Sequence, residues 1–98
     1  MNKEIKLYKL TSGEEVIATL VGAAPDYIEV TDAVSLVYHQ VGEGKMSAGF
    51  APFMPYSDGN ILIKSTAICG TSNVKDQLLD EYKRVFSPII QPPSGIVL

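Results

Sequence analysis

The residue types most often used in enzyme chemistry are scarce in this chain. It contains one histidine, His39, and one cysteine, Cys69. A thiolate beside a histidine base can act as a nucleophile, and the two need not be neighbours in sequence. A zinc site needs several clustered His, Cys or carboxylate ligands. We expect Cys69 to be a small buried residue and His39 to be solvated. The chain is therefore not expected to be an enzyme or to hold a metal or cofactor.

Tyrosines near expected loop boundaries offer a different kind of chemistry. Tyr27, Tyr38 and Tyr56 occupy such positions. Single-stranded nucleic acid is held partly by bases that stack on aromatic rings. The alternative for each tyrosine is a place at the rim of the core, with the ring buried and the hydroxyl in water. A cluster of these rings from several chains would favour nucleic-acid binding over that alternative.

The charge balance argues against one simple mode of nucleic-acid binding. Eleven acidic and eight basic residues give a net charge of −3 and a pI near 4.9. This sign is wrong for a domain that binds nucleic acid by phosphate neutralisation alone. An assembly of several copies can still gather a few lysines on one face.

The overall composition predicts a single folded domain spanning residues 1–98. The chain is 46% hydrophobic and 19% charged, with one cysteine and no long apolar run. This length leaves room for one core, and a chain of this size with one cysteine is typical of a reducing compartment. We expect a soluble cytoplasmic protein with no export signal or membrane span.

Period-two patterning predicts a small, bent β-barrel over about residues 4–70. In the first strand Ile5 and Leu7 lie on one face and Tyr8 and Leu10 on the other. Four further strands are expected at 15–21, 27–38, 46–54 and 61–69. The apolar phase shifts near residues 32–33, and a glycine and a proline interrupt the fourth strand. These bend signals favour a barrel over a flat sheet.

The last predicted element is an amphipathic helix at about residues 73–87, followed by an extended tail at 88–98. Six apolar residues form one stripe at helical spacing: Val74, Leu78, Leu79, Tyr82, Val85 and Phe86. Pro88 ends the helix. The stripe is expected to pack on the end or face of the barrel.

Residues 10–33 resemble the first motif of the Sm/Lsm family. The motif positions that carry this resemblance are Leu10, Gly13, Val16, Ala18, Leu20, Gly22 and the pair Asp32-Ala33. The segment Ile68-Cys69-Gly70 is similar to the family's second motif, Ile-Arg-Gly, without its arginine. The helix comes last in this chain, whereas the family usually begins with one. Small Sm-like proteins of phage or marine-metagenome type are the most similar.

The resemblance implies a mainly β fold, namely a five-stranded, strongly bent antiparallel Sm-like (SH3-like) barrel with a C-terminal amphipathic helix. Family members form rings by pairing the edge strands of neighbouring subunits. Their loops between strands two and three and between strands four and five bind RNA. The expected setting is the cytoplasm of a bacterial or phage-infected host cell.

Two hypotheses follow for function. The first is a homo-oligomeric ring that binds single-stranded RNA, or DNA, as an accessory factor in nucleic-acid processing. The residues expected to contact nucleic acid are Asp26, Tyr27, Tyr56, Asp58 and Asn60 at bases and Lys45 or Lys64 at phosphates. The second is a non-enzymatic structural module that oligomerises and docks a protein partner through its helix or its tail at residues 91–98.

Overall fold

The structure is a computed structural model that describes residues 4–86. The strands are β1 (Glu4–Leu10), β2 (Glu15–Ala23), β3 (Tyr27–Gly42), β4 (Lys45–Pro52), β5 (Ile61–Lys64) and β6 (Ile68–Asn73). A short 3-10 helix, η1 (Ser65–Ala67), joins β5 to β6, and α1 (Asp76–Phe86) follows. The mainly β class with a C-terminal helix is confirmed. The predicted tail lies outside the described residues.

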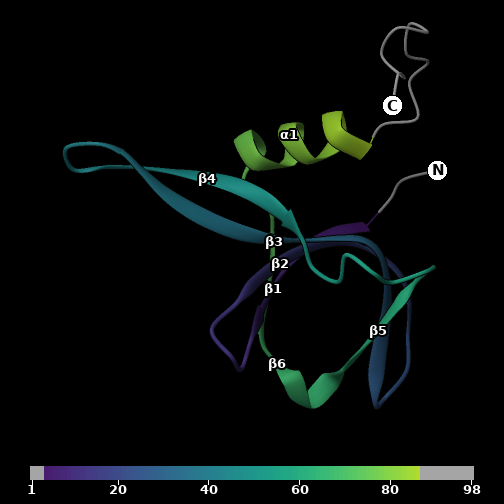
Figure 1. Cartoon of the computed structure of the whole chain (residues 1–98). Coiled ribbons are helices and arrows are strands. Elements are labelled where there is room, and N and C mark those ends of the chain that lie inside the picture. The colour runs from purple at the N-terminus through teal and green to yellow at the C-terminus, as the bar shows by residue number, and fades with distance from the viewer. Residues whose placement is uncertain (1–3, 87–98) are drawn as a thin grey trace, which may run out of the picture.

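The strands form one antiparallel sheet in the order β4-β3-β2-β1-β6, with β5 also paired to β3. Residues 34–42 of β3 pair with β4, and residues 27–30 pair with β5. Among the described strands, no pairing joins β4 or β5 to β6, so the sheet does not close. The strands nevertheless curl around a common interior (Figure 1). The fifth predicted strand, 61–69, was wrong as a single strand because its two halves pair with different neighbours.

The bend predicted in the third strand is confirmed at Asp32. Its φ of 55° makes it the one non-glycine residue with positive φ in the part of the chain described. The pairing of β3 with β2 shifts register here, between Ile17 and Thr19. A residue in this left-handed conformation breaks the regular extension of the strand. The two halves of β3 can therefore belong to differently directed parts of the sheet.

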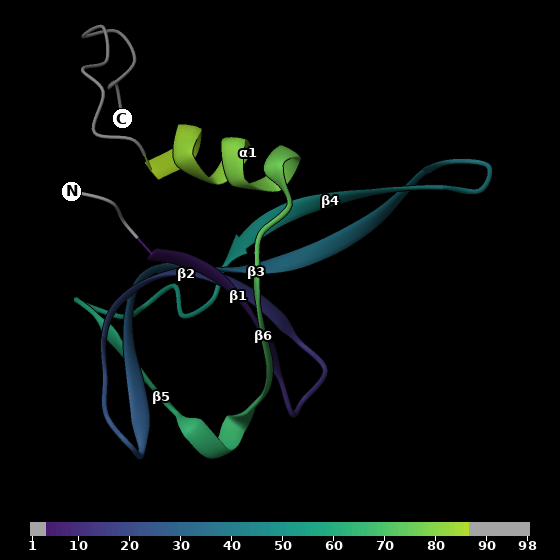
Figure 2. The same ribbon diagram turned by 180° about the vertical axis from the view of Figure 1, so that it is seen from behind.

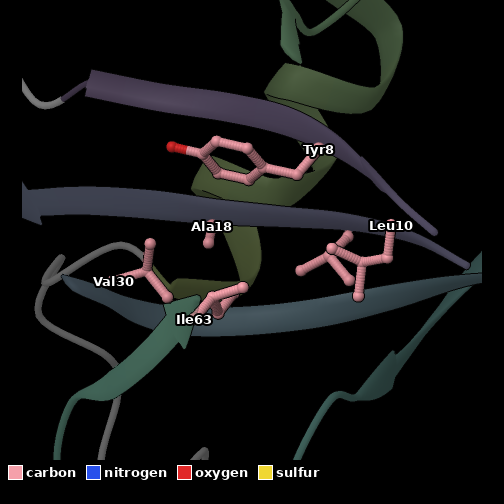
Figure 3. Packing of buried hydrophobic residues seen from close by; sticks show 6 residues of the cluster. Tyr8, Leu10, Ala18, Val30 and Ile63 are labelled. Atoms are coloured by element: carbon pink, nitrogen blue, oxygen red, sulfur yellow. The ribbon is translucent and has the colours of Figure 1, made fainter. Parts of the chain in front are cut away.

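Apolar residues are buried on both faces of the sheet. One cluster lies inside the curl of the strands and consists of Tyr8, Leu10, Val16, Ala18, Val30 and Ile63, most of which Figure 3 shows. The other lies beneath the helix and consists of Ile17, Val34, Leu36, Val74 and Tyr82. The alternation predicted for β1 is confirmed, because Ile5 and Leu7 pack against the second cluster.

Helix α1 is fixed to the sheet by Tyr82, which is 1% exposed. The Tyr82 hydroxyl donates to the main-chain carbonyl of Asp32 at 2.8 Å and lies 3.0 Å from the Thr19 hydroxyl. Its ring also packs 4.8 Å from that of Phe86, measured between centroids. The predicted stripe was wrong at Val85, which is 55% exposed. No helix among residues 4–86 is long and apolar enough to cross a membrane.

The helix begins later than the expected residue 73. Asn73 is still part of β6, where it pairs with Lys6 and its side-chain carbonyl accepts a hydrogen bond from the Lys6 amine at 3.0 Å. The chain thus completes its pairing with β1 before it turns into α1. As Figure 2 shows, α1 then lies along the sheet beside the β3–β4 hairpin, which projects from the rest of the strands.

Candidate nucleic-acid interface

Two turns that are distant in sequence meet at one end of the sheet. The main-chain N–H of Ser65, at the start of η1, donates to the carbonyl of Asp26 at 2.8 Å. The Ser65 hydroxyl also donates to the carbonyl of Pro25 at 3.3 Å. The β2–β3 turn is itself closed by a bond from the Ala24 N–H to the Tyr27 carbonyl at 2.8 Å. We call residues 24–27 and 64–67 together the corner.

Tyr27 and Lys64 are direct cross-strand partners at the corner. Opposed residues of an antiparallel pair project from the same face, with Cβ atoms about 5 Å apart. Both side chains are exposed, Tyr27 at 39%. A tyrosine and a lysine thus project from neighbouring positions, a combination that can stack a base and contact its phosphate.

The same outer face continues from Tyr27 and Lys64 along β3 and β5. Glu29 is opposite Leu62, which is 60% exposed. The Asn60 side-chain amide donates to the Glu29 carboxylate at 2.9 Å. We call Tyr27, Glu29, Asn60, Leu62 and Lys64 the outer patch. The residues between them point the other way, since Ile63 is buried in the core within the curl.

The remaining predicted contact residues are not part of the outer patch. Tyr56, which is 99% exposed, and Asp58 lie in the segment between β4 and β5. Lys45 is opposite Gly42 at the tip of the β3–β4 hairpin. In Figure 1 this tip points away from the β2–β3 turn. Four of the seven predicted residues, namely Asp26, Tyr27, Asn60 and Lys64, are thus brought to the β3–β5 pair.

Sequence reasoning missed three residues of this region. Ser65 was placed inside a continuous strand, although the three polar residues Lys64-Ser65-Thr66 interrupt the apolar run. Glu29 and Leu62 follow the period-two pattern of their strands. Nothing in their local sequence indicates that β5 pairs with the beginning of β3, so their proximity could be found only from the topology.

A groove of about 710 Å³ lies between α1 and the β3–β4 hairpin. Its apolar wall includes Tyr38, Met46, Phe50 and Leu78, and its polar wall includes Lys75. Tyr38 and Met46 are more than half exposed. The Tyr38 hydroxyl donates to the Glu15 carboxylate, and this bond, together with burial and the Glu15 charge, raises the pKa of Tyr38. Tyr38, Val41 and Met46 on this hairpin are three of the exposed large apolar side chains.

The two residues considered for nucleophilic catalysis lie on separate elements. Cys69 is exposed, which corrects the expectation of a buried residue, and its Sγ atom lies 3.7 Å from the Leu10 carbonyl oxygen. The neighbouring Ile68 packs against the cluster inside the curl, so the Cys69 side chain faces the other way. His39 lies on the hairpin, opposite Ser47. Within residues 4–86 there is no group of three or more His, Cys, Asp or Glu side chains that could hold a metal ion.

Comparison with known proteins adds no family assignment. No protein-family model matches the chain, and no curated protein matches it.

Proposed function

We propose that this chain is a subunit of an Sm-like ring that binds single-stranded nucleic acid, RNA or DNA, at the corner. The single observation that carries the proposal is the hydrogen bond from Ser65 to Asp26, which holds the β2–β3 turn against η1. It joins the two loops that the family resemblance associates with RNA.

The correspondence depends on the split of the predicted fifth strand. Because β4 and β5 pair with successive parts of β3, together they take the place of the family's fourth strand. β6, which pairs with β1, takes the place of the fifth strand. The loop between strands four and five is then η1, and the curl of the sheet corresponds to the strongly bent Sm-like barrel. The corner is the resulting binding site.

Assembly into a ring is supported by the two ends of the sheet. β4 and β6 each have a neighbour on one side only among the described strands. Unpaired edges offer main-chain N–H and C=O groups to another strand. Pairing β4 of one copy with β6 of the next uses two different surfaces, and such a contact closes into a ring when the rotation between subunits allows it.

A ring also repeats one cationic side chain at every copy of the site. Lys64 lies beside the stacking ring of Tyr27 in every copy. Repetition around a symmetry axis therefore places one ammonium group per subunit along the path of a bound strand. A cation placed beside each stacking ring gives a bound strand one phosphate contact per subunit, although Asp26 and Glu29 are also found at this site.

The experiment that tests this proposal combines mass and binding. Light scattering on the purified full chain gives the subunit number, and fluorescence anisotropy with labelled single-stranded RNA and DNA gives affinity at about 50 and 200 mM salt. We expect an oligomer whose affinity for single-stranded RNA or DNA is lowered by salt and by Tyr27→Ala. Tyr56→Ala, a change to an exposed tyrosine outside the corner, should lower that affinity much less. A monomer, or an oligomer that binds neither RNA nor DNA, would refute the proposal.

The exposed apolar hairpin favours a second candidate function. Tyr38, Val41 and Met46 are each more than half exposed on this projecting element. Tyr38 and Met46 also line the groove beside α1, and exposed apolar surface of this kind marks interaction sites. The second candidate is a structural module that self-associates and captures a protein partner without binding nucleic acid. An oligomer with no affinity for oligonucleotides in the same titration would select this candidate. The tail proposed from sequence as a docking element lies outside the described residues.

A further inference from the structure

We infer that the outer patch selects bases that carry an exocyclic amino group, namely adenine, cytosine and guanine, over uracil and thymine. This inference rests on the proposed function and specifies the ligand of the same site. It is carried by the pair of Glu29 and Asn60 beside Tyr27 on one face of β3 and β5.

Glu29 presents a carboxylate that is held in place and remains accessible. The Asn60 amide donates to Glu29 Oε2 at 2.9 Å, which fixes the side chain along the strand. On the other side of β3 the partner of Glu29 is Gly22, which has no side chain to cover it. An added Cβ at Gly22 would lie 4.0 Å from Glu29 Oε1. Glu29 is only partly buried, and its Oε1 lies on the Gly22 side, while the hydrogen bond from Asn60 uses Oε2.

The residues around this carboxylate can position a base. Tyr27 and Glu29 are two apart on the same strand face, a separation of about 6.6 Å along β3. Leu62 is directly opposite Glu29 and Lys64 directly opposite Tyr27. A base stacked on Tyr27 and Leu62 therefore has its edge toward Glu29 and its phosphate within range of Lys64. The four side chains form a compact site with an apolar floor and one acceptor at its edge.

A carboxylate at the base edge discriminates by hydrogen-bonding type. An ionised Glu has acceptors only, and the Asn60 carbonyl oxygen is a further acceptor. Adenine offers its N6 amino group and cytosine its N4 amino group as donors, whereas thymine and uracil have a carbonyl oxygen at that position. Two acceptors facing each other repel, and the one donor on the pairing edge of uracil, N3–H, lies between the carbonyl oxygens O2 and O4. A uracil that reaches the carboxylate through N3–H therefore brings an acceptor close to it on either side, whereas an amino group stands at one end of the pairing edge of its base. Guanine presents N–H donors on its pairing edge.

The experiment compares labelled RNA homopolymers of about fifteen nucleotides, a length within the site sizes of single-strand binding proteins. Poly-A, poly-C and poly-U are titrated against the full-length protein by anisotropy at one salt concentration. We expect poly-A and poly-C to bind about tenfold more tightly than poly-U, which is the size of effect of one good base-edge contact. In Glu29→Gln this ratio should fall to near one, because the amide offers both donor and acceptor.

Glu43→Gln is the matched control, because it removes the same charge at the hairpin tip, far along β3 from the patch. It should leave the ratio unchanged even if all affinities rise. Asn60→Ala, which frees Glu29 to move, should lower the ratio partially and provides a second variant if Glu29→Gln does not fold. Equal binding of the three polymers, tighter binding of poly-U, or an unchanged ratio in Glu29→Gln would overturn the inference while leaving nucleic-acid binding intact. The absence of binding to any of these polymers and to single-stranded DNA of the same length would refute the proposed function, and the inference with it.

Discussion

The main-chain N–H of Ser65 lies 2.8 Å from the main-chain carbonyl oxygen of Asp26, although the two residues are far apart in sequence. Main-chain hydrogen bonds of this kind fix the relative position of two turns regardless of side-chain identity. The turn before β3 and the 3-10 helix after β5 thus form one surface. The side chains of Tyr27 and Lys64 project from that surface as direct neighbours.

The first prediction concerns the attachment of α1. Replacing Tyr82 by Phe removes a buried hydroxyl that bonds to the Asp32 carbonyl and contacts the Thr19 hydroxyl. We expect a loss of about 1–2 kcal/mol in the free energy of unfolding, since the Asp32 carbonyl and the Thr19 hydroxyl lose a partner. Urea denaturation followed by circular dichroism measures it. Tyr56→Phe, at a 99% exposed position, should change stability by less than about 0.5 kcal/mol. Equal effects of the two changes would contradict this role for Tyr82.

The second prediction concerns alkaline pH. Burial raises the pKa of Tyr82 in the folded state from 10.0 to about 12, with the Asp32 charge adding to the increase and the Thr19 hydrogen bond opposing it. As pH rises above 10 the unfolded chain loses this proton first, so the stabilisation present below pH 10 is lost progressively toward pH 12. Denaturation midpoints measured from pH 8 to 11.5 should fall less steeply in Tyr82→Phe than in the wild type. Parallel curves would show that Tyr82 does not contribute.

The third prediction concerns the edge strand β6. Successive main-chain N–H groups of an antiparallel strand point alternately to one neighbour and to the other side. Of Thr71→Pro and Ser72→Pro, one therefore removes a bond to β1 and the other an N–H on the free edge. We expect one variant to lose fold stability, and the other to keep it but to lose self-association, as measured by light scattering. Retention of the wild-type mass by both variants would exclude β6 from the assembly contact.

The fourth prediction separates the lysines that sequence analysis grouped together. Lys64 is at the corner, whereas Lys45 is at the hairpin tip. Removing one phosphate contact from a single-strand complex lowers the slope of log affinity against log salt by about 0.7. For Lys64→Ala we expect the slope to decrease by this amount for each subunit that contacts the strand, and for Lys45→Ala we expect no change in slope. Anisotropy titrations across a salt series measure both slopes. The reverse pattern would move the binding site to the hairpin.

Local patterning was sufficient to predict several features of the fold. The two faces of β1 were predicted from the alternation of Ile5 and Leu7 with Tyr8 and Leu10, since pleating alone determines which residues share a face. The bend at Asp32 was indicated by the phase shift of the apolar residues. The mainly β class and the helix stripe, apart from Val85, followed from period alone.

The split of the predicted fifth strand required information that local sequence does not contain. Ile61 to Cys69 is apolar enough for one strand, yet β5 pairs with β3 and β6 pairs with β1. Between these two strands the chain passes from the side of β3 to the side of β1, and η1 is the segment that connects them. The same long-range pairing brings Lys64 to Tyr27, and it exposes Cys69. Tertiary pairing, rather than propensity, decides these features.

The location of the bound strand is the most direct test of the account. A photoreactive single-stranded oligonucleotide would be cross-linked to the full-length protein at low salt, and the modified peptides identified by mass spectrometry. The account predicts cross-links at Tyr27 and at the neighbouring residues 64–67, and their loss in Tyr27→Ala. Cross-links confined to the hairpin around Tyr38 and Met46, or to Tyr56, would contradict it, as would the absence of any specific cross-link.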